Sequence, residues 1–341
     1  MAKDLTILVQ WQDDLITLAP VPLIFVANFY QKHRLARAIV YIVLWVTSIF
    51  IVINALSGLV AYVALKLGPQ SYKLIGNQRV TAALKNVQNI ATHPQGYIIM
   101  LAGGLIAMAV TLPDVRKMLA RFIPIDPNST LHACAISLAV LVISYEIGTQ
   151  LIINVLAIEA SSPGITKTDL ILSEIPFLII AFVGVGIFIR RSPKEALSRL
   201  GLTMPSWKGI LAAVILTVLL LIISFGFDVA LHHISPSTSQ TLQKAEEKFF
   251  GHLQNLSGAV TAGLVAGICE ETLFRGALQP RLGIVFTSVL FAALHTEYGL
   301  SVDTLNIFIL SVSLGLLRKY FNTSSSILTH VLYDFSAFFI P

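Results

Sequence analysis

The chain has 341 residues, of which 55% are hydrophobic and only 12% are charged, and its mean hydropathy is +0.80. A water-soluble globular domain carries about 25% charged residues, so this composition excludes an ordinary soluble domain and indicates a protein of the lipid bilayer. The formal net charge is +5. The lysines and arginines stand in short groups between apolar runs, which is typical of membrane topology signals and argues against a nucleic-acid partner.

The first residues of the chain, MAKDLTILVQWQDDLITLAP, do not have the pattern of a cleavable signal peptide. Acidic residues stand where a basic region followed by an apolar core is needed. We therefore expect the first strong span to act as an uncleaved membrane anchor. Cys134 and Cys269 both lie in apolar runs, and they predict neither a disulfide framework nor a metal site.

Long apolar runs follow one another along the chain and predict an all-α fold, a polytopic transmembrane helical bundle of about eight or nine spans. A full span needs about 20 residues, and several of the later runs are shorter. In lipid, only helices or a closed barrel satisfy their backbone hydrogen bonds, and these runs do not alternate as barrel strands do. The run at 15–29 contains Pro20 and Pro22 and is expected to lie at the interface. The candidate spans are 38–65, 97–112, 131–153, 170–189, 210–229, 256–274, 284–295, 305–317 and 327–340.

Basic residues next to alternate spans predict an N-terminus in the cytoplasm, by the positive-inside rule. They are Lys32, Arg34, Arg37, Arg116, Lys117, Arg121, Arg190, Arg191, Lys194, Arg199, Arg275, Arg281, Arg318 and Lys319. The first outer loop runs against this pattern, with Lys66, Lys73, Arg79 and Lys85. We expect a multi-pass integral membrane protein, in the plasma membrane if the host is a prokaryote.

A polar segment at 231–253 divides the chain into two parts. Residues 1–230 form an N-terminal block of about five apolar runs, each long enough to span a bilayer, and resemble no family. Residues 254–341 form a C-terminal core, and the ionisable residues of its spans are the candidate functional residues. Each such residue costs roughly 2.5–3.5 kcal/mol to insert and usually faces a bundle interior or a water-filled cavity. They are Glu270, Glu271, Arg275, His295, His330 and Asp334.

Helix geometry separates the two adjacent glutamates. Glu271 and Arg275 are four residues apart with the acid first, the order that favours an ion pair on one helix face, and they predict a structural salt bridge. Glu270 lies about 100° around the helix from Glu271, so the adjacent carboxylates point in different directions. Glu270 is therefore free for another task.

Glu270 and two histidines are expected at similar depths in the membrane. With a rise of about 1.5 Å per residue in a core of about 30 Å, Glu270 lies about 10 Å, His295 about 17 Å and His330 about 8 Å from the cytoplasmic face. A carboxylate in an apolar cavity is a stronger base than one in water. Glu270 is thus a candidate to take a proton from a water that attacks an amide carbonyl, with an imidazole to hold that water or to protonate the leaving amine. His330 and its i+4 neighbour, Asp334, are candidates to stabilise the oxyanion.

Three short motifs in this core resemble those of the CPBP family, the CAAX proteases and bacteriocin-processing enzymes, which includes the Ras-converting CAAX prenyl endopeptidases. The motifs EETLFR at 270–275, FAALH at 291–295 and HVLYD at 330–334 look like E-E-x-x-x-R, F-x-x-x-H and H-x-x-x-N/D. The resemblance covers residues 256–341. It implies an intramembrane glutamic endopeptidase without a cofactor, acting on a peptide or a membrane-associated protein, of which a prenylated CAAX protein is one form.

The same resemblance implies a role for each residue of the motifs. Glu270 would activate water, His295 would help to position it, and His330 with residue 334 would form the oxyanion hole. In the CAAX-processing branch the last motif commonly ends in asparagine, whereas this chain has Asp334. Because an ionised aspartate repels an oxyanion, Asp334 is expected to be protonated, to orient His330, or to play no part in the hole.

Two alternatives stay open. A zinc protease could use Glu270, His295 and His330, because two histidines and a carboxylate form a known catalytic zinc set, and members of the family have also been described as metalloproteases. Against it, the chain has no H-E-x-x-H motif. The other alternative is a non-catalytic membrane protein, namely a bacteriocin-immunity factor, a scaffold or a transporter. The intramembrane acids Glu146 and Glu174 keep this alternative open.

Overall fold

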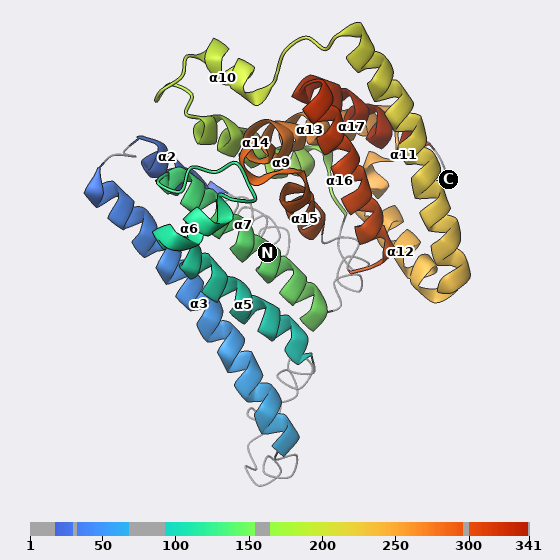
Figure 1. Ribbon diagram of the computed structural model, residues 1–341. Coiled ribbons are helices and arrows are strands. Elements are labelled where there is room, and N and C mark those ends of the chain that lie inside the picture. The colour runs from blue at the N-terminus through green and yellow to red at the C-terminus, as the bar shows by residue number, and fades with distance from the viewer. Residues whose placement is uncertain (1–17, 30–32, 68–92, 154–163, 296–299, 340–341) are drawn as a thin grey trace, which may run out of the picture.

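The computed structural model describes residues 18–29, 33–67, 93–153, 164–295 and 300–339, and these residues form helices and no strand (Figure 1). The N-terminal helices are α2 (Pro20–Phe29), α3 (Arg34–Leu67), α5 (Pro94–Val110), α6 (Pro113–Leu119), α7 (Thr130–Ile152), α9 (Lys167–Val185) and α10 (Pro193–Leu200). They are followed by α11 (Trp207–Ile234), α12 (Pro236–Phe249), α13 (Leu256–Glu271), α14 (Gln279–Leu282), α15 (Ile284–Leu294), α16 (Val302–Tyr320) and α17 (Thr323–Ala337). A 3-10 turn at Gly251–Leu253 precedes α13, and a π-helix at Thr272–Leu278 joins α13 to α14.

Five helices in the described part of the chain are long and apolar enough to cross a membrane. They lie at 34–64, 130–152, 167–185, 207–234 and 256–282, and a sixth span is formed if α5 and α6, which are bent by 101°, count as one. The expected eight or nine spans are not confirmed. Helix α15 has 11 residues and reaches only about half of a hydrocarbon core of about 30 Å. The apolar run at 284–295 is equally short, and counting it as a span contributed to the expected number.

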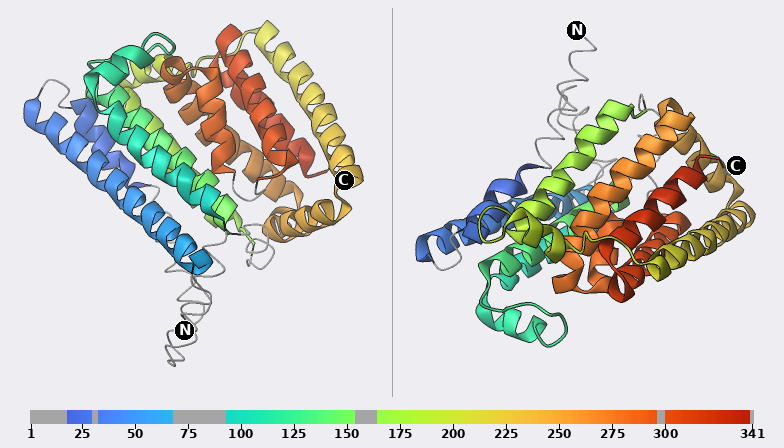
Figure 2. Two further views of the ribbon diagram at one scale, coloured as in Figure 1. Left: turned by 60° about the horizontal axis from the view of Figure 1, so that its bottom comes forward. Right: turned by 90° about the horizontal axis from the view of Figure 1, so that it is seen from above.

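Two groups of helices lie side by side and share a core. Helices α3, α5 and α7 pack against one another on one side, and α11, α16, α17 and α13 pack on the other (Figure 2). Helix α15 joins the groups, because it contacts both α7 and α16. Helix α9 contacts α13 and, on its other side, α2, which packs on α7. The largest apolar cluster accordingly combines residues from both groups, namely Ala139 on α7 and Ile307 on α16, with Ala181 on α9 and Phe291 on α15 between them. The division of the chain at residue 230 stays a prediction.

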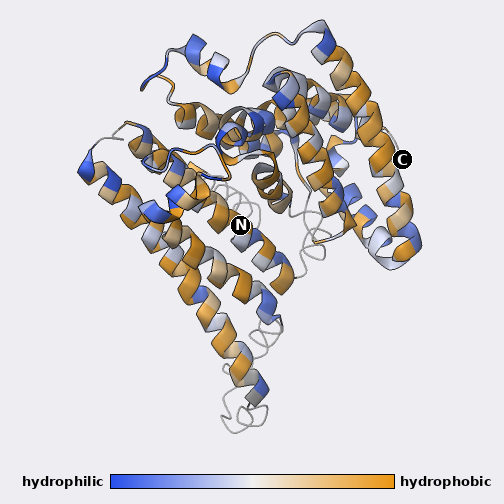
Figure 3. Ribbon diagram, viewed as in Figure 1, coloured by the Kyte–Doolittle hydropathy of each residue, from blue (hydrophilic) through white to orange (hydrophobic). Residues whose placement is uncertain are grey.

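The surface of the helices is apolar along their length. Figure 3 shows hydrophobic residues along α3 and α11 and hydrophilic residues gathered at α10 and α14. Large side chains such as Phe50 and Ile222 are exposed on these helices, as expected of surfaces that face lipid. Of the run at 15–29, residues 15–17 lie outside the described residues, and residues 20–29 form α2, which packs on α7 and α9.

A pair of glycines brings α13 against α17. Gly263 and Gly267 are one helical turn apart on α13, in the small-xxx-small spacing that lets two membrane helices approach closely. A Cβ at Gly263 would lie 2.8 Å from the Val331 carbonyl oxygen, and one at Gly267 would lie 2.8 Å from a methyl group of Val331. The backbone of α17 therefore lies directly on α13, and the neighbouring His330 is carried toward the end of α13.

Candidate active site

The ion pair expected from the spacing of Glu271 and Arg275 is present. Arg275 Nε lies 3.1 Å from Glu271 Oε2, and neither side chain is exposed. Arg275 also donates through Nη2 to Ser311 Oγ on α16, at 2.9 Å. A buried arginine is thus held from two helices, which offsets part of the cost of removing its charge from water.

His330 stands between the two glutamates. Its Nδ1 lies 3.2 Å from Glu271 Oε1, and its Nε2 lies 3.8 Å from Glu270 Oε2 and 3.3 Å from Asp334 Oδ2. Whichever ring nitrogen carries a hydrogen, a carboxylate lies beside it to accept it. Glu271 therefore serves both Arg275 and His330, one with each oxygen, whereas helix geometry within α13 alone had assigned it only to the arginine. The additional partner comes from α17 and is invisible to reasoning about one helix.

Glu270 is buried at the end of α13, with 7% of its surface exposed. Its Oε2 makes no hydrogen bond to any residue that the structure describes. The charges that act on it most strongly belong to His295, His330, Asp334 and Glu271. The structure therefore brings the first glutamate and both histidines of the three motifs into one electrostatic cluster. One carboxylate oxygen in this cluster has no donor among the described residues.

His295 follows the last residue of α15 and is oriented by Phe291. Its Nδ1 lies 2.8 Å from the Phe291 carbonyl oxygen, and the two rings lie 4.5 Å apart between centroids. The Phe291 ring also lies 6.2 Å from the His330 ring and 5.2 Å from the Arg275 guanidinium. The spacing of the second motif placed Phe291 only beside His295. The structure shows that its ring packs against three polar groups of the site, namely His295, His330 and Arg275.

Asp334 lies one turn after His330 on α17, and 24% of its side chain is exposed. Its carboxylate is 3.3 Å from His330 Nε2. Of the three possibilities considered for an aspartate at this position, the orientation of His330 is the one that this distance supports. Participation of Asp334 in an oxyanion hole stays a prediction.

A π-helix directly follows the two glutamates, and its free carbonyl groups have partners. Arg318 Nε donates to the Arg275 carbonyl oxygen at 3.1 Å, and Arg199 Nη1 donates to the Gly276 carbonyl oxygen at 3.1 Å. Interruptions of this kind are frequent at functional sites. Sequence reasoning missed the π-helix, Ser311 and both arginine contacts. Only the glycine pair at 263 and 267 had a signal in the sequence, its GxxxG spacing.

The zinc alternative gains no support from the geometry. In the part of the chain that the structure describes, no three His, Cys, Asp or Glu side chains are grouped so as to hold a metal ion. Both cysteines are buried and free. Of the two other intramembrane acids, Glu174 on α9 is buried and interacts electrostatically with Cys269, next to Glu270. Glu146 lies on α7.

Comparison with known proteins identifies the segment that carries the site. Residues 252–336 match the family described as Type II CAAX prenyl endopeptidase Rce1-like. No curated protein and no solved structure matches the chain. The matched segment contains all three motifs and the helices α13, α15, α16 and α17, which build the site. This segment is about a quarter of the chain, and its match supports the resemblance to the CAAX proteases that the three motifs indicate.

Proposed function

We propose that the chain is an intramembrane endopeptidase in which Glu270 activates water for hydrolysis of a peptide bond. One observation carries the proposal. Glu270 Oε2 is buried, makes no hydrogen bond to the described residues, and lies 3.8 Å from His330 Nε2. A buried carboxylate oxygen normally has a donor, and a water between this oxygen and the histidines would supply one.

The proposed reaction uses Glu270 as base and then as acid. Glu270 takes a proton from the water as the water oxygen attacks the amide carbonyl carbon, and the carbonyl oxygen becomes an oxyanion. An imidazole N–H of His295 or His330 stabilises this oxyanion. When the intermediate collapses, the C–N bond breaks and the amine leaves with the proton from Glu270. The contact of Glu271 with Nδ1 of His330 fixes the ring so that Nε2 faces Glu270.

The substrate that we propose is a peptide or membrane-associated protein, with a prenylated C-terminal CAAX sequence as the first form to test. The description of the matching family, a CAAX prenyl endopeptidase, supports this choice. The first motif lies in a helix long and apolar enough to cross a membrane, which supports cleavage within or next to the bilayer.

We further propose that the N-terminus lies in the cytoplasm, and that the membrane is the plasma membrane in a prokaryotic host. Basic residues from four separate segments gather at one place, because the charges of Arg190, Arg191, Arg281 and Arg318 all act on Arg199. By the positive-inside rule, a face of this kind is cytoplasmic. Of the residues that run against this orientation, 73, 79 and 85 lie outside the described residues.

The test compares the wild type with Glu270→Gln in liposomes, with a farnesylated peptide that ends in a CAAX sequence as the probe. Loss of the general base should slow cleavage by about 10²–10⁴-fold. Glu146→Gln is the control, because Glu146 is also an intramembrane acid but lies on α7, away from the cluster. Cleavage by Glu270→Gln at the wild-type rate would disprove the role of this glutamate.

A second measurement covers the case in which the wild type does not cleave this probe. Membrane-protein termini from cells that express the wild type are compared with those from cells that express Glu270→Gln. A terminus that forms only with the wild type supports a peptidase with another substrate. Identical termini, together with loss of a growth or immunity phenotype in the variant, would contradict the peptidase proposal. They would favour a binding or transport role.

A further inference from the structure

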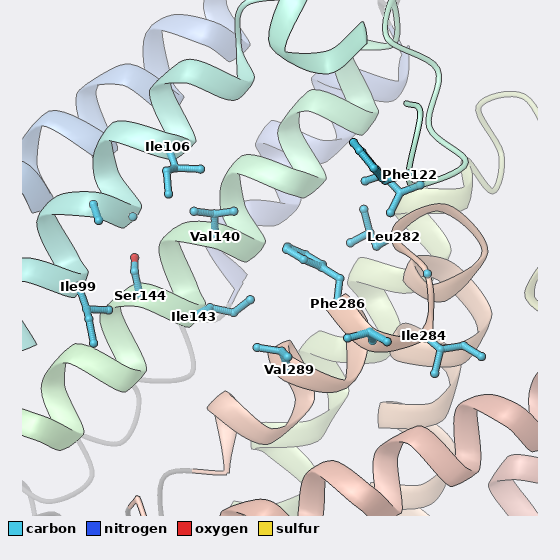
Figure 4. A pocket seen from close by; sticks show the side chains of 15 residues that line it. Ile99, Ile106, Phe122, Val140, Ile143, Ser144, Leu282, Ile284, Phe286 and Val289 are labelled. Carbon is cyan, nitrogen blue, oxygen red and sulfur yellow. The ribbon is translucent and has the colours of Figure 1, made fainter. Parts of the chain in front are cut away.

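An apolar cavity separates the N-terminal helices from the site-bearing ones. It has a volume of about 710 Å³ and lies between α5 and α7 on one side and α14 and α15 on the other (Figure 4). Ser144 is the only polar side chain among the described residues that line it. The volume is in the range of about 300–1,000 Å³ that is typical of small-molecule sites. Glu270 and the histidines do not line it, so this cavity is distinct from the candidate active site.

The rim of the cavity is basic. Phe122 and Leu282 line the cavity at the end where the loop after α6 meets α14 (Figure 4), and the exposed Arg121 and Arg281 precede them in the chain. Arg281 Nη1 lies 3.5 Å from the Pro124 carbonyl oxygen. The Arg281 guanidinium is therefore held beside the loop that closes this end of the cavity.

Arg281 also belongs to a cluster of like charges. Its charge acts on Arg190 and on Arg199. Burial, and then the charges of Arg281 and three further arginines, lower the pKa of the Arg199 guanidinium to about 10. The charges with the largest effect on Arg199 in the described part of the chain are all positive. The exposed Glu195 acts on Arg191, so the described cluster is not free of acids, but its arginines outnumber them. A cluster with an excess of arginines favours a phosphate, which accepts several N–H donors at once.

We propose that the cavity and this rim bind one anionic phospholipid, with an acyl chain in the cavity and the phosphate on Arg281. Basic pockets between membrane helices on the cytoplasmic side are suited to anionic headgroups. A zwitterionic lipid matches the cavity but not the net charge of the rim, and a free phosphate matches the rim but not the cavity. Only an anionic amphiphile uses both. A lipid bound here joins α5 and α7 to α15, and so connects the N-terminal helices to the site-bearing ones.

The first test uses the purified full-length chain in detergent. Native mass spectrometry and thermal unfolding are measured with phosphatidylglycerol, phosphatidylcholine and glycerol 3-phosphate. We expect phosphatidylglycerol alone to be retained and to raise the unfolding temperature. Equal retention of phosphatidylcholine would overturn the proposal in favour of an unselective apolar groove. An equal rise with glycerol 3-phosphate would overturn it in favour of a phosphate site.

Two matched pairs of variants locate the site. Arg281→Gln should weaken phosphatidylglycerol binding about fivefold, the effect of one basic residue near an anionic surface, whereas Lys194→Gln, also exposed and basic, should not. Ala102→Trp fills the cavity from a lining position and should abolish retention. Its control is Ile98→Trp, at an exposed residue of the same helix that does not line the cavity. If the members of both pairs bind alike, the site is elsewhere and the proposal fails. The readout is lipid binding, so its outcome is independent of whether the chain cleaves peptides.

Discussion

His330 on α17 and Glu271 on α13 meet across two helices, with Nδ1 and Oε1 3.2 Å apart and both side chains buried. The other oxygen of Glu271 holds Arg275 at 3.1 Å. One carboxylate thus connects the ion pair within the first motif to the histidine of the third. The positions of the motifs relative to one another depend on this residue as much as on helix packing.

The first prediction concerns this carboxylate. Glu271→Gln leaves the buried Arg275 without its counter-ion, and loss of one partner of a buried pair costs about 3–5 kcal/mol. Stability should be measured by reversible unfolding in mixed detergent micelles. Arg275→Met should also destabilise the fold, because the buried Glu271 then keeps the His330 contact but loses the guanidinium. The double variant should lose less than the sum of the two, since no unpaired charge remains; strictly additive losses would contradict the pairing.

The second prediction concerns Asp334, which ends the third motif. If Asp334 orients His330 by accepting from Nε2, an asparagine at this position keeps an acceptor oxygen, whereas a leucine has none. Asp334→Asn should therefore retain cleavage, and Asp334→Leu should lose roughly tenfold to a hundredfold, the range expected for a hydrogen bond to a charged group. Cleavage of the farnesylated peptide measures both variants. Equal activity of the leucine variant and the wild type would show that Asp334 plays no part.

The sequence predicted those features of the site that depend on one helix. The pairing of Glu271 with Arg275 and the shared face of His330 and Asp334 follow from the 3.6-residue period, which holds wherever a helix forms. The contact of His330 with Glu271 could not be predicted in this way. It depends on how closely α17 approaches α13. This close approach is possible because the residues at 263 and 267 are glycines, which have no Cβ.

The number of spans was less predictable than the site. Apolar runs give the positions of helices, and the runs at 210–229 and 305–317 lie inside α11 and α16. Whether a helix crosses the membrane also depends on its length and on the direction it takes, as the 101° bend between α5 and α6 illustrates. The π-helix at 272–278 had no signal at all, because its backbone is stabilised by Arg199 and Arg318 from distant segments.

The third prediction tests the close approach of α13 and α17. Gly263→Ala places a methyl group 2.8 Å from the Val331 carbonyl oxygen, so the helices must move apart, at a cost of about 1–3 kcal/mol for overpacking. Cleavage should fall as well, because His330 moves with α17. The control is Gly226→Ala on α11, where no atom lies within 4 Å of the new methyl group. This control should gain about 0.5–1 kcal/mol in helix propensity; similar losses in both variants would contradict the packing argument.

The fourth prediction separates the glutamate mechanism from the zinc alternative. If Glu270 acts as a base on water, cleavage of the farnesylated peptide should be unchanged after incubation with EDTA or 1,10-phenanthroline and dialysis. A zinc enzyme needs three protein ligands and the ion, so it should lose its activity and regain it with added Zn²⁺. Metal analysis of the purified protein is the accompanying measurement. Chelator-sensitive activity that zinc restores would favour the metal mechanism.

The last prediction concerns Phe291, whose ring packs 4.5 Å from His295 and 5.0 Å from Phe274. Phe291→Leu keeps most of the apolar volume but removes the aromatic contacts, each of which contributes about 0.5–1.5 kcal/mol beyond burial. The matched control is Phe177→Leu, because Phe177 also packs edge-on against Phe274, at 5.9 Å. Phe291→Leu should lose more stability, because its ring is buried and makes more contacts than that of Phe177. Only Phe291→Leu should lower cleavage per folded molecule, since His295 and His330 lose the ring that orients them. Equal cleavage by the two variants would show that Phe291 contributes only to packing.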